Sequence, residues 1–72
     1  MLQTYLHQLE DAAAKYEVRL LDAYLEAGLA DSNYYRHRQG VHEVSEKIAV
    51  RVLNAIQKLG ARKLRAAARR IA

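Results

Sequence analysis

Apolar residues recur at three- and four-residue steps along most of the chain, which is the spacing of one helix face. In the first 27 residues this stripe consists of Leu2, Tyr5, Leu6, Leu9, Ala13, Tyr16, Leu20, Tyr24 and Ala27. Nothing between Glu10 and Leu21 is a glycine, a proline or an obvious cap, so the stripe fits one long helix or two shorter ones. No stretch alternates like a strand. The pattern predicts an all-α protein, a small helix-turn-helix bundle of four to five helices.

Two glycines divide the middle of the chain. Gly28 predicts the end of the first helical part, because glycine readily adopts the left-handed conformation that ends many helices. Asp31 or Ser32 can then cap a second helix, which we predict over Asp31 to Gln39 with its end at Gly40. The turn between them is Gly28-Leu29-Ala30, and two helices joined this tightly form a helix-turn-helix arrangement.

The second half of the chain predicts one helix and a tail. Ser45 is a plausible N-cap, and Val44 before it can pack onto Ala49. The buried stripe of this helix is predicted to be Ile48, Val52, Ala55, Ile56 and Leu59. Gly60 either stops the helix or costs about 1 kcal/mol inside it. Beyond it we expect an amphipathic tail helix with Leu64, Ala67, Ala68 and Ile71 on one side. The whole chain is then one helical domain, with a core at 18–59 and a basic tail at 60–72.

Charge is distributed unevenly along the chain. Residues 1–32 have two cations against six acids, a net of −4, whereas 33–56 have a net of +2. Residues 57–72 have six cations and no acid, a net of +6. A basic back half favours an anionic partner, either nucleic acid or a membrane surface.

The segments LLDAYLEAG, GLADSNYYRHRQG and VSEKIAVRVLNAI together resemble the lambda-repressor-like (Cro and XRE-type) helix-turn-helix DNA-binding domains. The resemblance covers roughly Val18 to Leu59. It implies a sequence-specific transcription regulator, a repressor of phage or mobile-element type that occupies operator DNA as a homodimer. Two residues depart from the family pattern. Ala30 stands where a Ser or Thr cap is common, and Tyr24 stands where a small alanine usually packs, so Tyr24 should force the helices apart or turn its hydroxyl outward.

The faces of the short helix support the same interpretation. Leu29, Tyr34 and His37 fall on one side and should face the core. The other side offers groups that can read base edges in a major groove, namely Ser32, Tyr35, Arg36 and Gln39. Arg36 is the strongest candidate, since a guanidinium can bond O6 and N7 of guanine together. The candidates for contacts with the DNA backbone are Asn33, Arg38, Lys47, Arg51, Arg62 and Arg65. Asp31 we interpret as a cap.

Composition adds expectations about partners and location. The 72 residues include no cysteine, proline, tryptophan or phenylalanine, so the core is thin and a homodimer is expected. Its surface could include Leu2, Leu6 and Leu9, or Leu64 and Ile71. No apolar run is long enough for a membrane span and no signal peptide is recognisable, which favours a cytoplasmic protein with no membrane partner.

Other kinds of chemistry find little support. His7 with Glu10 and Asp11 has helical metal spacing, and His37 and His42 flank Gly40, yet no three ligands converge in the sequence, so we expect no metal and no cofactor. Four tyrosines are predicted to lie in the core: Tyr5, Tyr16, Tyr24 and Tyr34. No catalytic motif occurs, and we do not expect an enzyme.

Two rival functions remain from the sequence. In the first, the chain is a helical-hairpin adaptor whose basic tail grips an acidic protein. In the second, the tail lies on a membrane surface. This function ranks below both the regulator and the adaptor, because the apolar side of the tail is mostly alanine.

Overall fold

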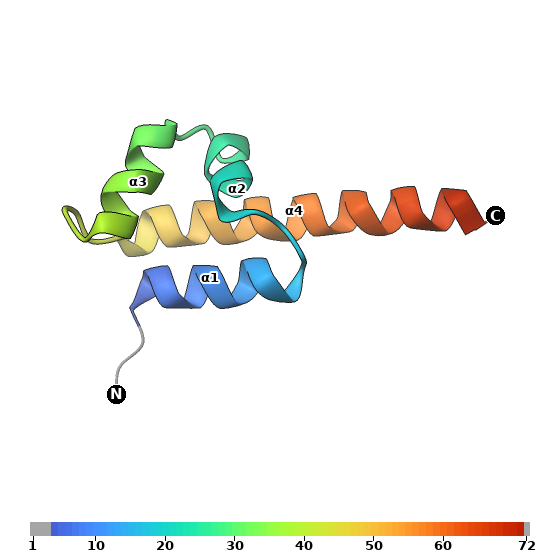
Figure 1. Ribbon diagram of the computed structural model, residues 1–72, viewed down its shortest axis with the longest axis horizontal. Coiled ribbons are helices and arrows are strands. Elements are labelled where there is room, and N and C mark those ends of the chain that lie inside the picture. The colour runs from blue at the N-terminus through green and yellow to red at the C-terminus, as the bar shows by residue number, and fades with distance from the viewer. Residues whose placement is uncertain (1–3, 72) are drawn as a thin grey trace.

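The computed structural model describes the backbone of residues 4–71 and the side chains of 4–69. This part of the chain forms four helices and no strand (Figure 1): α1 (Tyr5–Lys15), α2 (Leu20–Glu26), α3 (Asp31–Gln39) and α4 (Glu46–Ile71). The prediction of a small all-α bundle is confirmed. The N-terminal stripe is divided between two helices.

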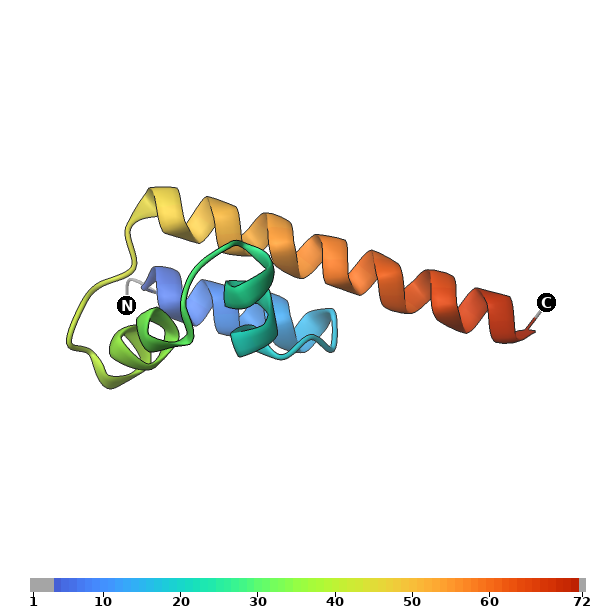
Figure 2. The ribbon, with the colours of Figure 1, turned by 90° about the horizontal axis from the view of Figure 1, so that it is seen from above.

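Helices α1 and α2 pack against α4, and α3 packs against α2. In both views α1 and α4 lie side by side and run in the same direction (Figures 1 and 2). In Figure 1, α2 and α3 lie on the other side of α4 from α1, and α2 contacts α1, α3 and α4. The last turns of α4 extend well past the other helices in both views. We call residues 61–69, whose side chains are all exposed, the arm.

The break between α1 and α2 is a left-handed turn made without glycine. Glu17 has a φ of 55°. Its N–H donates to the carbonyl of Ala14, and the N–H of Val18 donates to the carbonyl of Ala13. This pair of bonds is the Schellman motif that usually recruits glycine. This turn could not be predicted from the sequence, because a glutamate in this conformation is uncommon.

The same motif ends α2 and α3, here with glycine. Gly28 has a φ of 84° and Gly40 a φ of 79°. After α2, the N–H groups of Gly28 and Leu29 donate to the carbonyls of Leu25 and Tyr24. The predicted bounds of the short helix, Asp31 and Gln39, are confirmed. Its predicted cap is wrong, because the N-cap residue is Ala30, which makes no side-chain bond, and Asp31 is already helical.

Helix α4 begins as predicted and then continues through Gly60. The hydroxyl of Ser45 accepts from the N–H of Ile48 at 3.3 Å, which confirms the cap. Of the two alternatives at Gly60, the structure shows the continuing helix, since α4 is unbroken to Ile71 and the basic tail is its last part. Gly60 is buried, and a Cβ built on it would lie 2.8 Å from Cδ1 of Tyr16. Glycine at this position therefore lets the end of α1 approach α4 closely.

One hydrophobic core joins all the helices, the α1–α2 turn and the segment before α4. Its buried apolar residues are Leu9, Ala13, Val18, Leu20, Ala23, Tyr24, Val44, Ala49, Val52, Ala55 and Ile56. Of the predicted stripe of α4, Ile48 and Leu59 are half-buried against this core.

Two residues of α1 differ from expectation. Tyr5, predicted to be in the core, is 41% exposed because it lies at the first position of α1, at the rim of the bundle. Leu9, a predicted contributor to a dimer surface, is buried in the core of the single chain. Leu2 and the side chain of Ile71 lie outside the described residues.

Candidate nucleic-acid interface

Helix α3 is held by the turn before it and by α4 beneath that turn. The Ala27 carbonyl accepts from Nη2 of Arg51 at 2.7 Å, so a side chain of α4 fixes the end of α2. Gly28 then reverses the chain, and α3 starts at Asp31. Arg51, which we predicted to contact DNA phosphate, therefore also stabilises the end of α2. The sequence did not indicate this contact.

The inner face of α3 packs against α2 as predicted. His37 is buried, and Leu29 and Tyr34 are half-buried beside the core. The rings of Tyr24 and Tyr34 meet edge to face, with their centroids 5.4 Å apart. This packing fixes the rotation of α3 about its axis, and so determines which side chains point away from the protein.

A buried hydrogen bond joins α2 to α3. The Tyr24 hydroxyl lies 2.8 Å from Nδ1 of His37, and Tyr24 has no exposed surface. Of the two alternatives expected for Tyr24, the outward hydroxyl is wrong, because the hydroxyl is buried and bonds to His37. Burial raises the pKa of Tyr24 to about 12, and the neighbouring Tyr34 and Glu10 add to the rise.

His37 is held in its neutral form by the same burial. Removal from water lowers the pKa of the His37 imidazole, and the nearby His42 lowers it further. The Tyr24 hydroxyl and Nδ1 of His37 therefore share one hydrogen bond between uncharged groups, whose donor depends on the imidazole tautomer. Sequence reasoning placed both residues on inner faces but could not pair them, since they are contributed by different helices.

The outer face of α3 is open to solvent. The four candidates for base contacts, Ser32, Tyr35, Arg36 and Gln39, are all exposed. Tyr35 keeps 47% of its surface exposed although its ring packs edge to face on Tyr34. Hydroxyl, guanidinium and amide groups thus stand together on one exposed helix face.

The candidates for backbone contacts are more dispersed. Asn33 is half-buried on α3, and Arg38 donates to the Tyr34 hydroxyl at 3.4 Å. Lys47 is exposed at the start of α4, whereas Arg62 and Arg65 lie on the arm. The structure therefore groups the α3 residues and leaves the arm cations further along α4.

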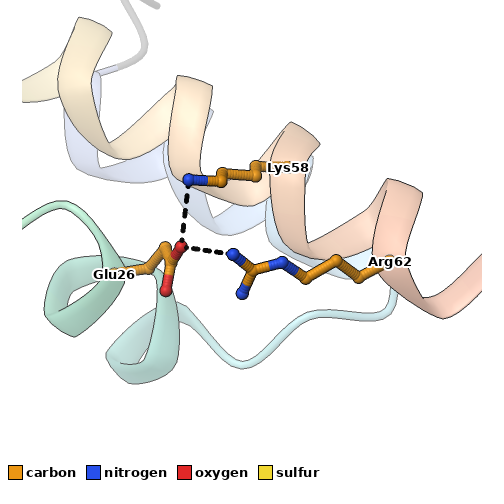
Figure 3. A network of polar contacts seen from close by, with 3 residues as sticks. All are labelled: Glu26, Lys58 and Arg62. Carbon is orange, nitrogen blue, oxygen red and sulfur yellow. Dashed lines mark hydrogen bonds and ion pairs between the residues drawn. The ribbon is translucent and has the colours of Figure 1, made fainter.

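An acidic residue of α2 holds two cations of α4 (Figure 3). Oε1 of Glu26 lies 3.4 Å from Nζ of Lys58 and 3.0 Å from Nη2 of Arg62. Arg62 was predicted to meet phosphate, and here it meets a carboxylate of its own chain. Sequence reasoning missed this network, since no spacing rule links residues so far apart along the chain. Lys63 donates to the Glu17 carbonyl and so ties the start of the arm to the α1–α2 turn.

The described residues were also compared with what a metal site and a membrane span require. Within residues 4–69, no three His, Asp or Glu side chains are arranged to hold a metal ion. His7, His37 and His42 do line one cleft between α1 and the segment after α3. None of the described helices has the length and apolar character needed to cross a bilayer.

Comparison with known proteins adds no relative. No family model, no curated protein and no solved structure matches this chain.

Proposed function

We propose that this protein is a sequence-specific transcription regulator that binds double-stranded DNA through α3 in the major groove. The observation that supports this most is the exposed outer face of α3, which presents Ser32, Tyr35, Arg36 and Gln39 while the inner face is packed on α2. A helix–turn–helix pair with a rigid, polar second helix is a common way to present side chains to base edges.

Each exposed residue has a specific role in this proposal. Arg36 bonds O6 and N7 of a guanine, and Ser32 and Gln39 make further contacts with base edges. Tyr35 contacts a thymine methyl group or a phosphate. Exposed cations such as Arg38, Lys47 and Arg65 neutralise phosphates, which adds affinity and salt dependence without sequence preference.

The regulator acts as a homodimer on two half-sites. Each copy would insert one α3 helix, with the half-site centres about 10 bp apart, so that both helices approach the same side of the duplex. Occupying such a site near a promoter excludes polymerase, and the protein would then act as a repressor.

Selection of binding sites from a random double-stranded DNA pool tests the proposal. We expect an enriched inverted repeat at about 150 mM salt, near physiological ionic strength. Arg36→Ala should lower affinity for that site by about 10- to 100-fold and lose preference at one base pair. The matched control is Arg38→Ala, which should weaken binding to all sequences alike. A pool that stays random, or an Arg36→Ala variant with unchanged preference, would refute the proposal.

A second candidate function is an adaptor that grips an acidic protein. It is supported by the arm, which contains four cations and no acid among residues 61–69: Arg62, Lys63, Arg65 and Arg69. An adaptor should bind DNA weakly, in a salt-sensitive way and without sequence preference. The selection experiment therefore separates the two functions.

A further inference from the structure

A stripe of exposed apolar side chains runs along α4 outside the core. Val50 is 52% exposed, Leu53 37% and Leu64 70%. Leu64 follows Val50 by about four helical turns and Leu53 by about three, so the three side chains stand on the same side of the helix. Exposed Gln57 and Ala61 continue that side between them. We call these five residues the α4 stripe.

The stripe begins on the bundle and continues onto the arm. At its first end, Val50 and Leu53 line a hollow of about 250 Å³ between α1 and α4, together with the half-exposed Tyr5. At its other end, Leu64 belongs to the arm and is the most exposed of the three apolar residues. One exposed apolar residue is ordinary, whereas several on one side of a helix are a feature of interaction surfaces.

The stripe is complementary to itself when one copy is reversed. Val50 and Leu64 lie equally far from Gln57 on either side, and so do Leu53 and Ala61. An antiparallel second α4, related by a two-fold axis through Gln57, would set Val50 against Leu64 and Leu53 against Ala61. Apolar residues spaced by three and four positions are what two packed helices require at their seam.

Charge favours the same orientation. The arm has four cations and no acid among residues 61–69, while α1 has two acids, Glu10 and Asp11, against one cation, Lys15. Because α1 and α4 start at the same end of the bundle, a reversed partner brings its arm beside α1 and beside Glu46. A parallel partner would bring two cationic arms together, which costs free energy.

We propose that a second copy of this chain covers the α4 stripe, in an antiparallel dimer with its two-fold axis at Gln57. This dimer does not depend on DNA binding. A protein that dimerises without binding DNA would support this dimer and refute the proposed function. A monomer that selects a DNA site would refute this dimer and the two-half-site arrangement, but not the contact between α3 and the major groove.

Sedimentation equilibrium of the full chain tests whether the stripe mediates dimerisation. The wild type should be a dimer at micromolar concentration, and Leu64→Glu should raise the dissociation constant at least about 10-fold. The matched control is Leu25→Glu, since Leu25 is 51% exposed on α2 and lies off the stripe. The control should remain dimeric, and circular dichroism should show unchanged helix content in both variants. A monomeric wild type, or equal effects of the two variants, would overturn the proposal.

Cysteine cross-linking tests the orientation, because the chain has no cysteine of its own. Gln57→Cys should form a disulfide-linked dimer under mild oxidation. Leu64→Cys alone should not, whereas a mixture of Leu64→Cys and Val50→Cys chains should form the mixed dimer. Added salt should weaken the dimer, since it screens the attraction between arm and α1. Self-linkage of Leu64→Cys as fast as that of Gln57→Cys would indicate a parallel pair and overturn the antiparallel one.

Discussion

Tyr24→Phe removes one oxygen atom from the junction of α2 and α3 and keeps the ring. The lost hydroxyl lies 2.8 Å from Nδ1 of His37, and both side chains are buried. The deletion therefore leaves Nδ1 of a buried imidazole without this partner. An unsatisfied buried polar atom costs about 1 to 3 kcal/mol.

The expected loss is about 2 kcal/mol in the free energy of unfolding, which corresponds to a fall of about 10 °C in Tm for a domain of this size. Urea and thermal denaturation followed by circular dichroism measure both quantities. The matched control is Tyr34→Phe, because the Tyr34 hydroxyl has only a 3.4 Å contact with the exposed Arg38. That variant should lose less than about 0.5 kcal/mol. Equal losses in the two variants would refute the assignment of the buried bond.

Three further predictions concern stability. The free energy of unfolding should fall as pH drops through 6.5, because burial lowers the pKa of His37 and the unfolded chain takes up the proton first; an NMR titration midpoint for His37 at or above 6.5 would contradict this. Ser45→Ala should lower the free energy of unfolding by about 1 kcal/mol, because it removes the cap of α4. The control is Ser32→Ala, at an exposed position; equal losses in the two variants would show that the cap contributes nothing. Glu17→Gly should raise stability by about 1 kcal/mol by relieving the left-handed φ, and a loss in urea denaturation would show that no strain exists there.

The ends of α2 and α3 and the start of α4 could be predicted from the sequence because each depends on local backbone chemistry. Gly28 and Gly40 supply left-handed residues, and Ser45 supplies a cap. The division between α1 and α2 could not be predicted, since the residue that makes it is Glu17, which only the surrounding packing holds in a left-handed conformation.

In the candidate site, too, features set by nearby residues could be predicted and contacts between distant residues could not. Helical periodicity alone separates the inner face of α3 from its exposed outer face. The contacts that fix the site come from elsewhere in the chain: Tyr24 to His37, Arg51 to the Ala27 carbonyl, and Glu26 to Lys58 and Arg62. A periodic pattern carries no information about which distant residues meet, so these partners appear only once the helices have packed.

The close packing of Gly60 on Tyr16 means that substitutions at these two positions depend on each other. The Tyr16 ring occupies the volume that a β-carbon at position 60 would need, with an expected separation of only 2.8 Å. A larger residue at position 60 would improve helix propensity and yet collide with the ring. Position 60 is therefore free to vary only in chains where position 16 has lost its ring. Substitutions at the two sites should appear in pairs over evolutionary time, a covariation that would mark the contact between α1 and α4 in sequence data alone.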